Sequence, residues 1–267
     1  MPPEEGCRTS NNRSVTPASA APDKEYDGTA LVNGETALAT GAGWADGEGA
    51  DYTFTGSQTL VGNSANAFAY TLKANTKADN YTISKSEGTL TVKNRGAAYE
   101  VTVTANSATA TYDGTEKTAS GFERETAQGV PVQANGQTFY VTGLTSEAAG
   151  TDVADSKATI PVTGTAVVKD AAGNVVTDQF DVTVVKGSLT INKRSVTLTS
   201  ADLDKEYDGT ALVNGETALA TEAGWADGAG ADYIFTGSQT LVGNSANAFD
   251  YTLKANTKAD NYTISQS

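Results

Sequence analysis

The sequence predicts an all-β protein built from small tandem domains, and three observations support this. Short stretches alternate apolar and polar residues, which is the pattern of a half-buried strand. Thr occurs 40 times among the 267 residues, and Thr suits a pleated, half-exposed surface. No window of ten or more residues carries a helical apolar stripe. We therefore expect small β-sandwich or β-grasp-like domains in an extended array.

A four-residue motif, Tyr-Asp-Gly-Thr, occurs three times, at Tyr26–Thr29, Tyr112–Thr115 and Tyr207–Thr210. Asp-Gly favours a tight turn because Gly accepts a positive φ. A Tyr before the turn can bury its ring and keep its hydroxyl in water. Each motif is therefore predicted to end one strand, turn, and start the next, as a framework element. Its structural residues are Tyr26, Asp27, Gly28, Tyr112, Asp113, Gly114, Tyr207, Asp208 and Gly209.

The composition limits the classes of partner. The chain has 18 Lys and Arg against 32 Asp and Glu, a formal net charge of −14. Phosphate backbones and anionic lipid surfaces would repel it, so we expect neither nucleic-acid binding nor membrane insertion. Leu, Ile, Val and Phe total only 46 residues, a content at which disorder must be considered. The 11 Tyr and 2 Trp recur at repeated positions, which favours folded domains with thin cores.

Residues 1–22 form a polar segment that we expect to be a flexible leader with a vestigial first strand. Residues 11–16 resemble 192–197, but Pro17 replaces Leu198 and removes an amide donor. The first strand is therefore predicted to be short, frayed or absent. Cys7 is the only cysteine, so an intrachain disulfide is excluded. It is interpreted as an incidental thiol, because no apolar stretch precedes it to support lipid attachment.

An internal repeat dominates the chain. Asp23–Ser84 and Asp204–Ser265 are the same 62-residue sequence shifted by 181, and we call them the first and last repeats. Strands are predicted at 51–55, 68–72, 80–84 and 88–92, with Tyr52 and Phe54 on the opposite face from Thr53. The two repeats differ at four positions that are predicted to lie in loops or face outward: Gly41/Glu222, Glu48/Ala229, Thr53/Ile234 and Ala69/Asp250.

Three domains are predicted after the leader, at 23–93, 94–193 and 194–267. The divergent middle segment, 94–193, closes with Gly187–Ile191, which matches Gly88–Val92. Its other predicted strands are 101–104, 137–141, 157–162, 166–169 and 180–185, with a hairpin loop at 170–174. The last repeat lacks an equivalent of Gly88–Val92. We therefore expect it to expose an unpaired edge, to be the least stable domain, and to come from a longer array.

Several segments together resemble a known family. Beside Tyr-Asp-Gly-Thr, the first repeat contains Thr-Gly-Ser-Gln-Thr-Leu-Val-Gly (Thr55–Gly62), Lys-Ala-Asp-Asn-Tyr-Thr-Ile (Lys77–Ile83) and Gly-Thr-Leu-Thr-Val. These resemble the Tyr-Asp-Gly type repeats, often grouped with MBG domains, of cell-wall-anchored surface proteins from Gram-positive gut bacteria. The resemblance covers nearly the whole chain after the leader. It implies extracellular, tandem, mostly-β modules of an adhesin-like protein at the bacterial cell surface, with anchoring sequence outside this chain and no catalytic residues.

No catalytic, cofactor or metal site is predicted. His is absent, which removes the usual general base and the commonest metal ligand. The acidic loop Asp46–Asp51 invites a calcium interpretation, but it lacks the full ligand spacing and is interpreted as solvated. A Lys–Asn crosslink between Lys24 and Asn80 is a further alternative that the sequence leaves open. Its formation would lower the intact mass by one ammonia.

We therefore predict structural stalk or spacer repeats of an extracellular bacterial surface adhesin, whose partners are the neighbouring repeat domains. The alternative is that the modules bind mucin or host glycans through exposed aromatic side chains. The candidate ligand-contact residues for that alternative are Trp44, Tyr52, Trp225 and Tyr233. Packing within a thin domain is the competing interpretation of these aromatic residues.

Overall fold

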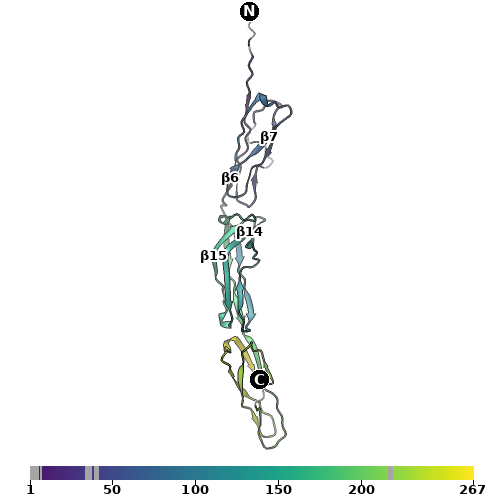
Figure 1. Cartoon of the computed structure of the whole chain (residues 1–267), viewed down its shortest axis with the longest axis vertical. Coiled ribbons are helices and arrows are strands. Elements are labelled where there is room, and N and C mark those ends of the chain that lie inside the picture. The colour runs from purple at the N-terminus through teal and green to yellow at the C-terminus, as the bar shows by residue number, and fades with distance from the viewer. Residues whose placement is uncertain (1–5, 7, 34–37, 39–41, 216–218) are drawn as a thin grey trace, which may run out of the picture. The chain divides into compact units, whose positions relative to one another are not determined.

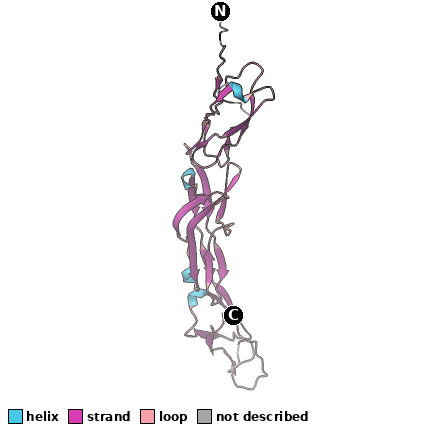
Figure 2. Cartoon of the chain, turned by 45° about the horizontal axis from the view of Figure 1, so that its top comes forward, coloured by secondary structure: helices cyan, strands magenta, loops and turns pink. Residues whose placement is uncertain are grey.

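A computed structural model describes residues 6, 8–33, 38, 42–215 and 219–267. Within them the chain is mostly β-strand, and its helical segments are short 3-10 turns (Figures 1 and 2). The predicted all-β class is confirmed. The chain divides into two compact units, described separately below. Unit 1 comprises Met1–Val101, Pro131–Tyr140 and Val167–Val182, and unit 2 comprises Thr102–Val130, Val141–Ala166 and Thr183–Ser267.

The first repeat lies in unit 1 and is built from short strands. Its closing strand β9 lies between β2, to which it is parallel, and β6, to which it is antiparallel. The elements are β1 (Arg13–Val15), β2 (Asp23–Glu25), β3 (Leu31–Val32), β4 (Ala50–Phe54), β5 (Ser57–Gln58), β6 (Gly62–Ala65), β7 (Phe68–Leu72), the 3-10 turn η1 (Ala78–Asn80), β8 (Tyr81–Ile83) and β9 (Thr89–Lys93).

Strand β4 confirms the predicted alternation, whereas in β7 Tyr70, expected on the inner face with Phe68, is 37% exposed. Tyr52 lies opposite Tyr70, and Phe54 opposite Phe68, which is buried. Thr53 lies between them on the exposed face. The pattern works because successive side chains of a strand point to opposite faces.

Residues 13–20, within the segment predicted to be a leader, are packed into unit 1. β1 pairs with β8, and the Ser84 and Ser86 amides donate to the carbonyls of Val15 and Pro17. Val15 is buried. Strand β1 has three residues, whereas its counterpart β18 (Arg194–Thr199) has six. The shortening agrees with the effect expected of Pro17.

Strands of the middle segment contribute residues to both units. β14 pairs with β12, β13 and β15, and β10 pairs with β16. The elements are β10 (Tyr99–Thr104), β11 (Ala108–Thr111), β12 (Lys117–Ser120), β13 (Val130–Ala134), β14 (Gln137–Gly150), η2 (Val153–Asp155), β15 (Val162–Lys169), η3 (Thr177–Gln179), β16 (Phe180–Val185) and β17 (Leu189–Asn192).

Two loops of the middle segment test the sequence-based expectations. The predicted hairpin loop is present: Asp170 accepts hydrogen bonds from the Ala172 and Asn174 amides, and a bridge joins Lys169 to Val175. The strand predicted at 157–162 is wrong. Lys157 makes an isolated bridge to Leu189, and the chain then bends at 158–159. Pro161 supplies no amide to continue a ladder there.

The last repeat lies in unit 2 and reproduces only part of the first. β21 and β23 pair as β4 and β7 do. Residues 204–206 and 243–246, the equivalents of β2 and β6, are not strands. The elements are β18 (Arg194–Thr199), β19 (Leu212–Val213), β20 (Thr221–Ala223), β21 (Ala231–Phe235), β22 (Ser238–Gln239), β23 (Phe249–Leu253), η4 (Ala259–Asn261) and β24 (Tyr262–Gln266).

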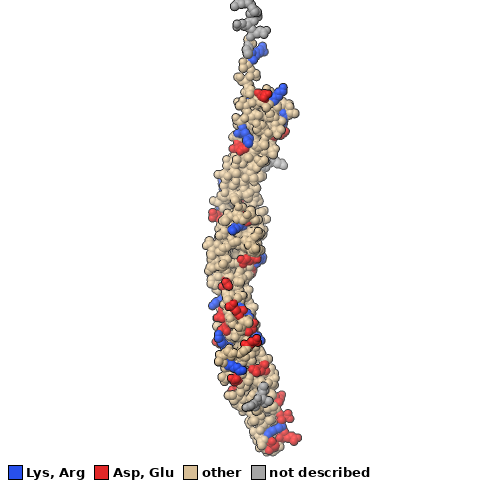
Figure 3. Space-filling view, in the orientation of Figure 1, with Lys and Arg blue, Asp and Glu red and all other residues tan. Residues whose placement is uncertain are grey.

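Clusters of buried apolar side chains contribute to the cores of both units. In unit 1, Val15, Ala42 and Tyr81 form one buried cluster, against which Trp44 and Ile83 pack. Unit 2 has a larger cluster, which joins side chains of the middle segment to those of the last repeat: Tyr112, Ala119, Ile160, Leu189, Ile191, Val196, Leu198, Leu219, Ala226, Phe249 and Tyr262. Acidic and basic side chains are interspersed on the face seen in Figure 3.

Candidate functional site: the Tyr-Asp-Gly-Thr junctions

Each Tyr-Asp-Gly-Thr motif forms the predicted turn, closed by its own aspartate. Asp27 Oδ1 accepts hydrogen bonds from the backbone N of Thr29, at 2.9 Å, and from its Oγ1, at 2.8 Å. The same pair of bonds joins Asp113 to Thr115 and Asp208 to Thr210. The glycine between has φ of 79°, 84° and 75° in the three turns, a conformation that favours Gly.

In each turn a lysine forms an ion pair with the aspartate of the motif. Lys24 Nζ lies 2.7 Å from Asp27 Oδ1 and also donates to the Thr29 carbonyl. In the last repeat Lys205 Nζ lies 2.9 Å from Asp208 Oδ1 and donates to Thr210 Oγ1.

The middle segment places its lysine on the other side of the motif. Lys117, four residues after Asp113, lies 2.6 Å from that carboxylate. The Lys117 hydrogen bond, with those from Thr115, holds the pKa of Asp113 well below its usual range. Sequence comparison with the repeats did not reveal this lysine, because the same contact is made from a different position.

In unit 1 the first turn lies against the middle segment. Tyr26 is only 1% exposed. Burial, followed by the nearby Asp170 carboxylate, raises the pKa of Tyr26 to about 12. Asn135 Nδ2 donates to the Asp27 carbonyl at 3.0 Å. A Cβ on Gly28 would lie 3.1 Å from the Phe139 ring, so Gly also permits this close approach.

Arg95 connects the first repeat to the middle segment in the same unit. Its Nη1 donates to the Tyr26 carbonyl and to the Tyr99 hydroxyl, at 3.1 and 3.0 Å. Its guanidinium stacks 3.9 Å from the Tyr99 ring centroid, and its backbone N donates to the buried Gln179. The planar, multivalent guanidinium suits such a junction.

In unit 2 the second turn lies against the last repeat. Tyr112 is 8% exposed and meets Tyr262 edge-on, with ring centroids 5.3 Å apart. Asn261, 1% exposed, accepts from the Val153 amide and donates to Asp152, at 2.9 and 2.8 Å. The Lys258 ammonium also pairs with Asp152. The contact therefore combines a buried aromatic pair with a satisfied polar network.

The receiving side of this second junction is the Lys-Ala-Asp-Asn-Tyr motif. Its members Lys258, Asn261 and Tyr262 all make the contacts above. In the first repeat the equivalent Asn80 is exposed, whereas Asn261 is buried; Lys77 and Lys258 are both exposed, but only Lys258 pairs with an aspartate among the described residues. The same sequence therefore lies in two different environments.

The third turn shows that turn formation and docking are separate. Asp208 accepts the same two hydrogen bonds from Thr210 as in the other two copies, and Lys205 pairs with Asp208 as Lys24 does with Asp27. Tyr207, however, is 63% exposed, against 1% for Tyr26. The local sequence thus forms the turn, and a neighbouring segment is needed to bury its tyrosine.

The four candidate ligand-contact aromatics are engaged in packing within their repeats. Trp44 meets Tyr81 edge-on at 4.8 Å and donates its indole N–H to the Tyr52 hydroxyl at 2.9 Å. Trp225 likewise packs on Tyr262, at 5.0 Å. Its indole N–H and the Tyr233 hydroxyl both donate to Glu222. Trp44 and Trp225 are half-buried.

The four substitutions between the repeats prove to be related in space. Thr53 lies opposite Ala69, and their replacements Ile234 and Asp250 lie opposite each other. In the aromatic cluster, Glu48 accepts a hydrogen bond from Tyr81 in the first repeat. The last repeat has Ala229 at that position, and Glu222 instead accepts hydrogen bonds from Trp225 and Tyr233. Each repeat thus supplies one carboxylate to its aromatic cluster, from a different position.

The geometry gives no specific support to the calcium site or to the Lys24–Asn80 crosslink. Within the described residues, no three His, Cys, Asp or Glu side chains form a group that could hold a metal ion. The hydrogen bonds of the Lys24 ammonium go to Asp27 and Thr29, and none goes to Asn80. Cys7 lies outside the described residues. No helix among those described is long and apolar enough to span a bilayer.

Comparison with protein-family models, curated proteins and solved structures yields no match to this chain.

Proposed function

We propose that this chain is a spacer of tandem β modules, a stalk segment of an extracellular bacterial surface adhesin. One observation carries the proposal. The same turn is used at two junctions, with Tyr26 and Tyr112 buried against the segment that follows each. A motif reused at successive junctions is what a repeating structural element requires.

The features of each junction suit a spacer. Each junction combines a buried tyrosine, a charged side chain that bonds across it (Arg95 or Lys258) and hydrogen bonds from an asparagine side chain. These contacts restrict bending more than a linker without them does. The exposed Tyr207 and the exposed Asn80 are counterparts of the buried Tyr112 and Asn261, the two sides of the second junction, and neither has a docked neighbour among the described residues. The resemblance to Tyr-Asp-Gly repeats supplies the proposed setting, the surface of a Gram-positive bacterium.

A glycan array tests this proposal against glycan binding by the modules. We expect no saturable binding of the full chain to mucin-type or host glycans, because Trp44 and Trp225 pack edge-on against tyrosines and use their indole N–H groups internally. Saturable binding that is lost in Trp44→Ala, with unchanged circular dichroism, would contradict the pure spacer proposal.

A further inference from the structure

Two stretches of unit 1 that are distant in the sequence run side by side in the same direction. Strand β1 is parallel to β8, β2 is parallel to β9, and a parallel bridge lies between these two pairs. The register is constant, because partners are always 68 positions apart: Arg13 and Tyr81, Ala18 and Ser86, Glu25 and Lys93. Residues 13–25 and 81–93 therefore form one continuous ladder, which we call the first parallel ladder.

Backbone hydrogen bonds cross this ladder from one end to the other. Pro17 and Pro22 have no amide to donate, but their carbonyls accept from the Ser86 and Thr91 amides, at 2.9 and 3.1 Å. The prolines therefore shorten the strands without opening the ladder. Two further bonds, both of 2.9 Å, lie near its ends, from the Ser84 amide to Val15 and from the Tyr26 amide to Lys93.

Buried polar side chains connect the two stretches at the centre of the ladder. Ser19 Oγ accepts from the Gly88 amide at 2.9 Å and donates to the Asn66 carbonyl at 2.6 Å. Asn66 bonds to both stretches, since its Nδ2 donates to the Ala20 carbonyl and its amide donates to the Gly88 carbonyl, each at 2.8 Å. Ser19 is 5% exposed and Asn66 is fully buried, so water does not compete for these bonds.

A glycine permits the close approach of the two stretches. A Cβ on Gly88 would lie 2.2 Å from the Ala20 carbonyl oxygen. The middle segment has the same feature, because a Cβ on Gly187 would lie 2.0 Å from the Asn106 carbonyl oxygen. The matching Gly residues of the two closing strands therefore have the same structural reason.

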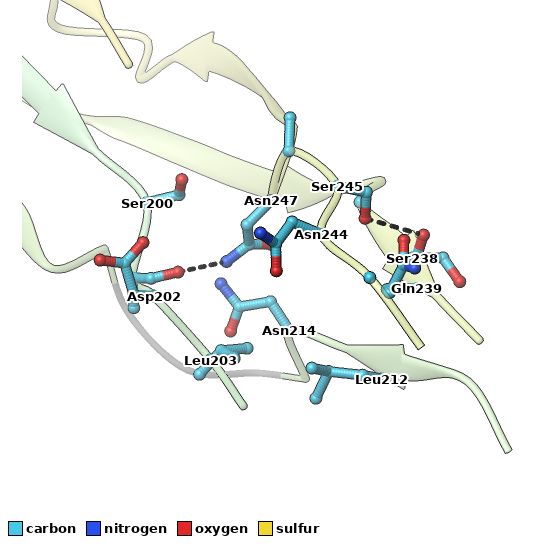
Figure 4. A pocket seen from close by; sticks show the side chains of 14 residues that line it. Ser200, Asp202, Leu203, Leu212, Asn214, Ser238, Gln239, Asn244, Ser245 and Asn247 are labelled. Carbon is cyan, nitrogen blue, oxygen red and sulfur yellow. Dashed lines mark hydrogen bonds between the residues drawn. The ribbon is translucent and has the colours of Figure 1, made fainter. Parts of the chain in front are cut away.

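Parallel ladders recur in unit 2. Strand β11 is parallel to β17, and the Tyr112 amide donates to the Asn192 carbonyl at 2.9 Å, as Tyr26 does to Lys93. In the last repeat β18 is parallel to β24. Asn247, the equivalent of Asn66, donates to the Ala201 carbonyl at 2.8 Å (Figure 4).

The direction of these ladders determines how tension along the chain acts on them. In a parallel pair the N-terminal ends of both strands lie at the same end of the ladder. Tension that enters before residue 13 and leaves after residue 93 therefore pulls on opposite ends of the first parallel ladder. The two stretches must slide past each other, which loads the hydrogen bonds together. A force applied to two neighbouring ends would instead break the bonds one after another.

We propose that the parallel ladders are mechanical locks, which allow the modules to carry tension along the chain without unfolding. In the first parallel ladder, Ser19, Asn66 and Gly88 are the residues that hold the two stretches together. The inference deepens the spacer proposal, on which its biological role rests, because a tether between a cell and a bound surface must transmit force.

Single-molecule force spectroscopy of the full chain tests this by changing only the direction of pulling. Two variants in a Cys7→Ser background share a handle at Asn12→Cys and carry the second handle at Lys93→Cys or at Asn80→Cys. Both second positions are exposed. The Lys93 handle loads the first parallel ladder lengthwise, whereas the Asn80 handle lies at the same end as Asn12 and peels it open.

At the same loading rate, the lengthwise pair is expected to unfold the first repeat at a force at least about twofold higher than the peeling pair. Equal forces in the two directions would overturn the proposal. Glycan binding, or a compact particle in solution, would instead contradict the spacer proposal and leave the ratio of the two forces unchanged.

Substitutions within the ladder give a second measurement. Ser19→Ala removes both hydrogen bonds of that hydroxyl, and Gly88→Ala forces the two stretches apart. Each is expected to lower the lengthwise force while the peeling force, which the first bonds near 13–15 determine, changes little. Thr53→Ile, which the last repeat carries at its equivalent exposed position, should change neither force. A loss from Ser19→Ala that is equal in both directions would contradict its assigned role.

Discussion

At the scale of single residues, side chains in identical sequence motifs differ in exposure because different segments pack against them. Tyr112 and Tyr207 belong to the same motif, with the same turn bonds around them. One is 8% exposed and the other 63%. The chain therefore contains its own control for the energetic value of docking.

Tyr112→Ala is expected to destabilise the protein by about 3 kcal/mol, because it removes a large buried side chain that packs on Tyr262. Tyr207→Ala should change the free energy of unfolding by no more than about 0.5 kcal/mol, as expected of an exposed position. Chemical denaturation followed by fluorescence measures both. Equal effects of the two substitutions would mean that docking contributes nothing.

Alkaline pH should destabilise unit 1 through Tyr26. Its pKa is about 12 in the folded protein, against about 10 in an unfolded chain. Between these values the folded state binds more protons, so stability falls as pH rises from about 10 to 12. Tyr26→Phe should remove about 1.4 kcal/mol per pH unit from that slope. Denaturation midpoints measured across this window test it. A slope unchanged by Tyr26→Phe would show that the hydroxyl is not buried in solution.

At the scale of elements, strand β9 determines whether the segments on its two sides form strands of one sheet. In the first repeat it binds β2 and β6 into one sheet. Residues 204–206 and 243–246 of the last repeat, which pair with no such strand among the described residues, form no strand, although their sequences are identical to those of β2 and β6. Strand structure here comes from the pairing partner more than from intrinsic propensity.

Native-state hydrogen exchange should distinguish the two repeats. Amides of β2 and β6 that bond to β9 are expected to exchange more than about tenfold more slowly than those at the equivalent positions 204–206 and 243–246. Amides of the pairs β4–β7 and β21–β23 serve as the internal control, because both repeats form them. Similar rates at 62–65 and 243–246 would contradict the expected instability of the last repeat.

At the scale of the whole molecule, the spacer proposal predicts that the protein is longer than a compact body of the same number of residues. A compact body of 267 residues would have a radius of gyration of about 18 Å. The spacer proposal predicts a clearly larger value in small-angle scattering of the dilute chain, because a spacer must be longer than a compact body of the same number of residues. A radius of gyration near 18 Å would contradict the spacer proposal, irrespective of the result of the glycan array.

Much of the local structure was predictable from the residues. Alternation placed Tyr52 and Phe54 on the inner face, and Pro17 accounted for a short β1. The strand expected at 157–162 was wrong, because a bend and Pro161 outweigh its apolar residues. The lysine clamp of the middle segment could not be found by alignment, since Lys117 reaches Asp113 from the opposite side of the motif.

The sequence by itself determined the all-β class and the three turns, because strand alternation and Asp-Gly turns depend on interactions within a few residues, and it showed the repeat directly as sequence identity. Only the tertiary structure decided which tyrosines are buried and which Lys-Ala-Asp-Asn-Tyr motif contacts the middle segment. Tyr26 and Tyr207, or Asn80 and Asn261, have the same neighbours in sequence and differ in exposure. Burial is a property of what packs against a residue, and that is set by segments distant in the chain.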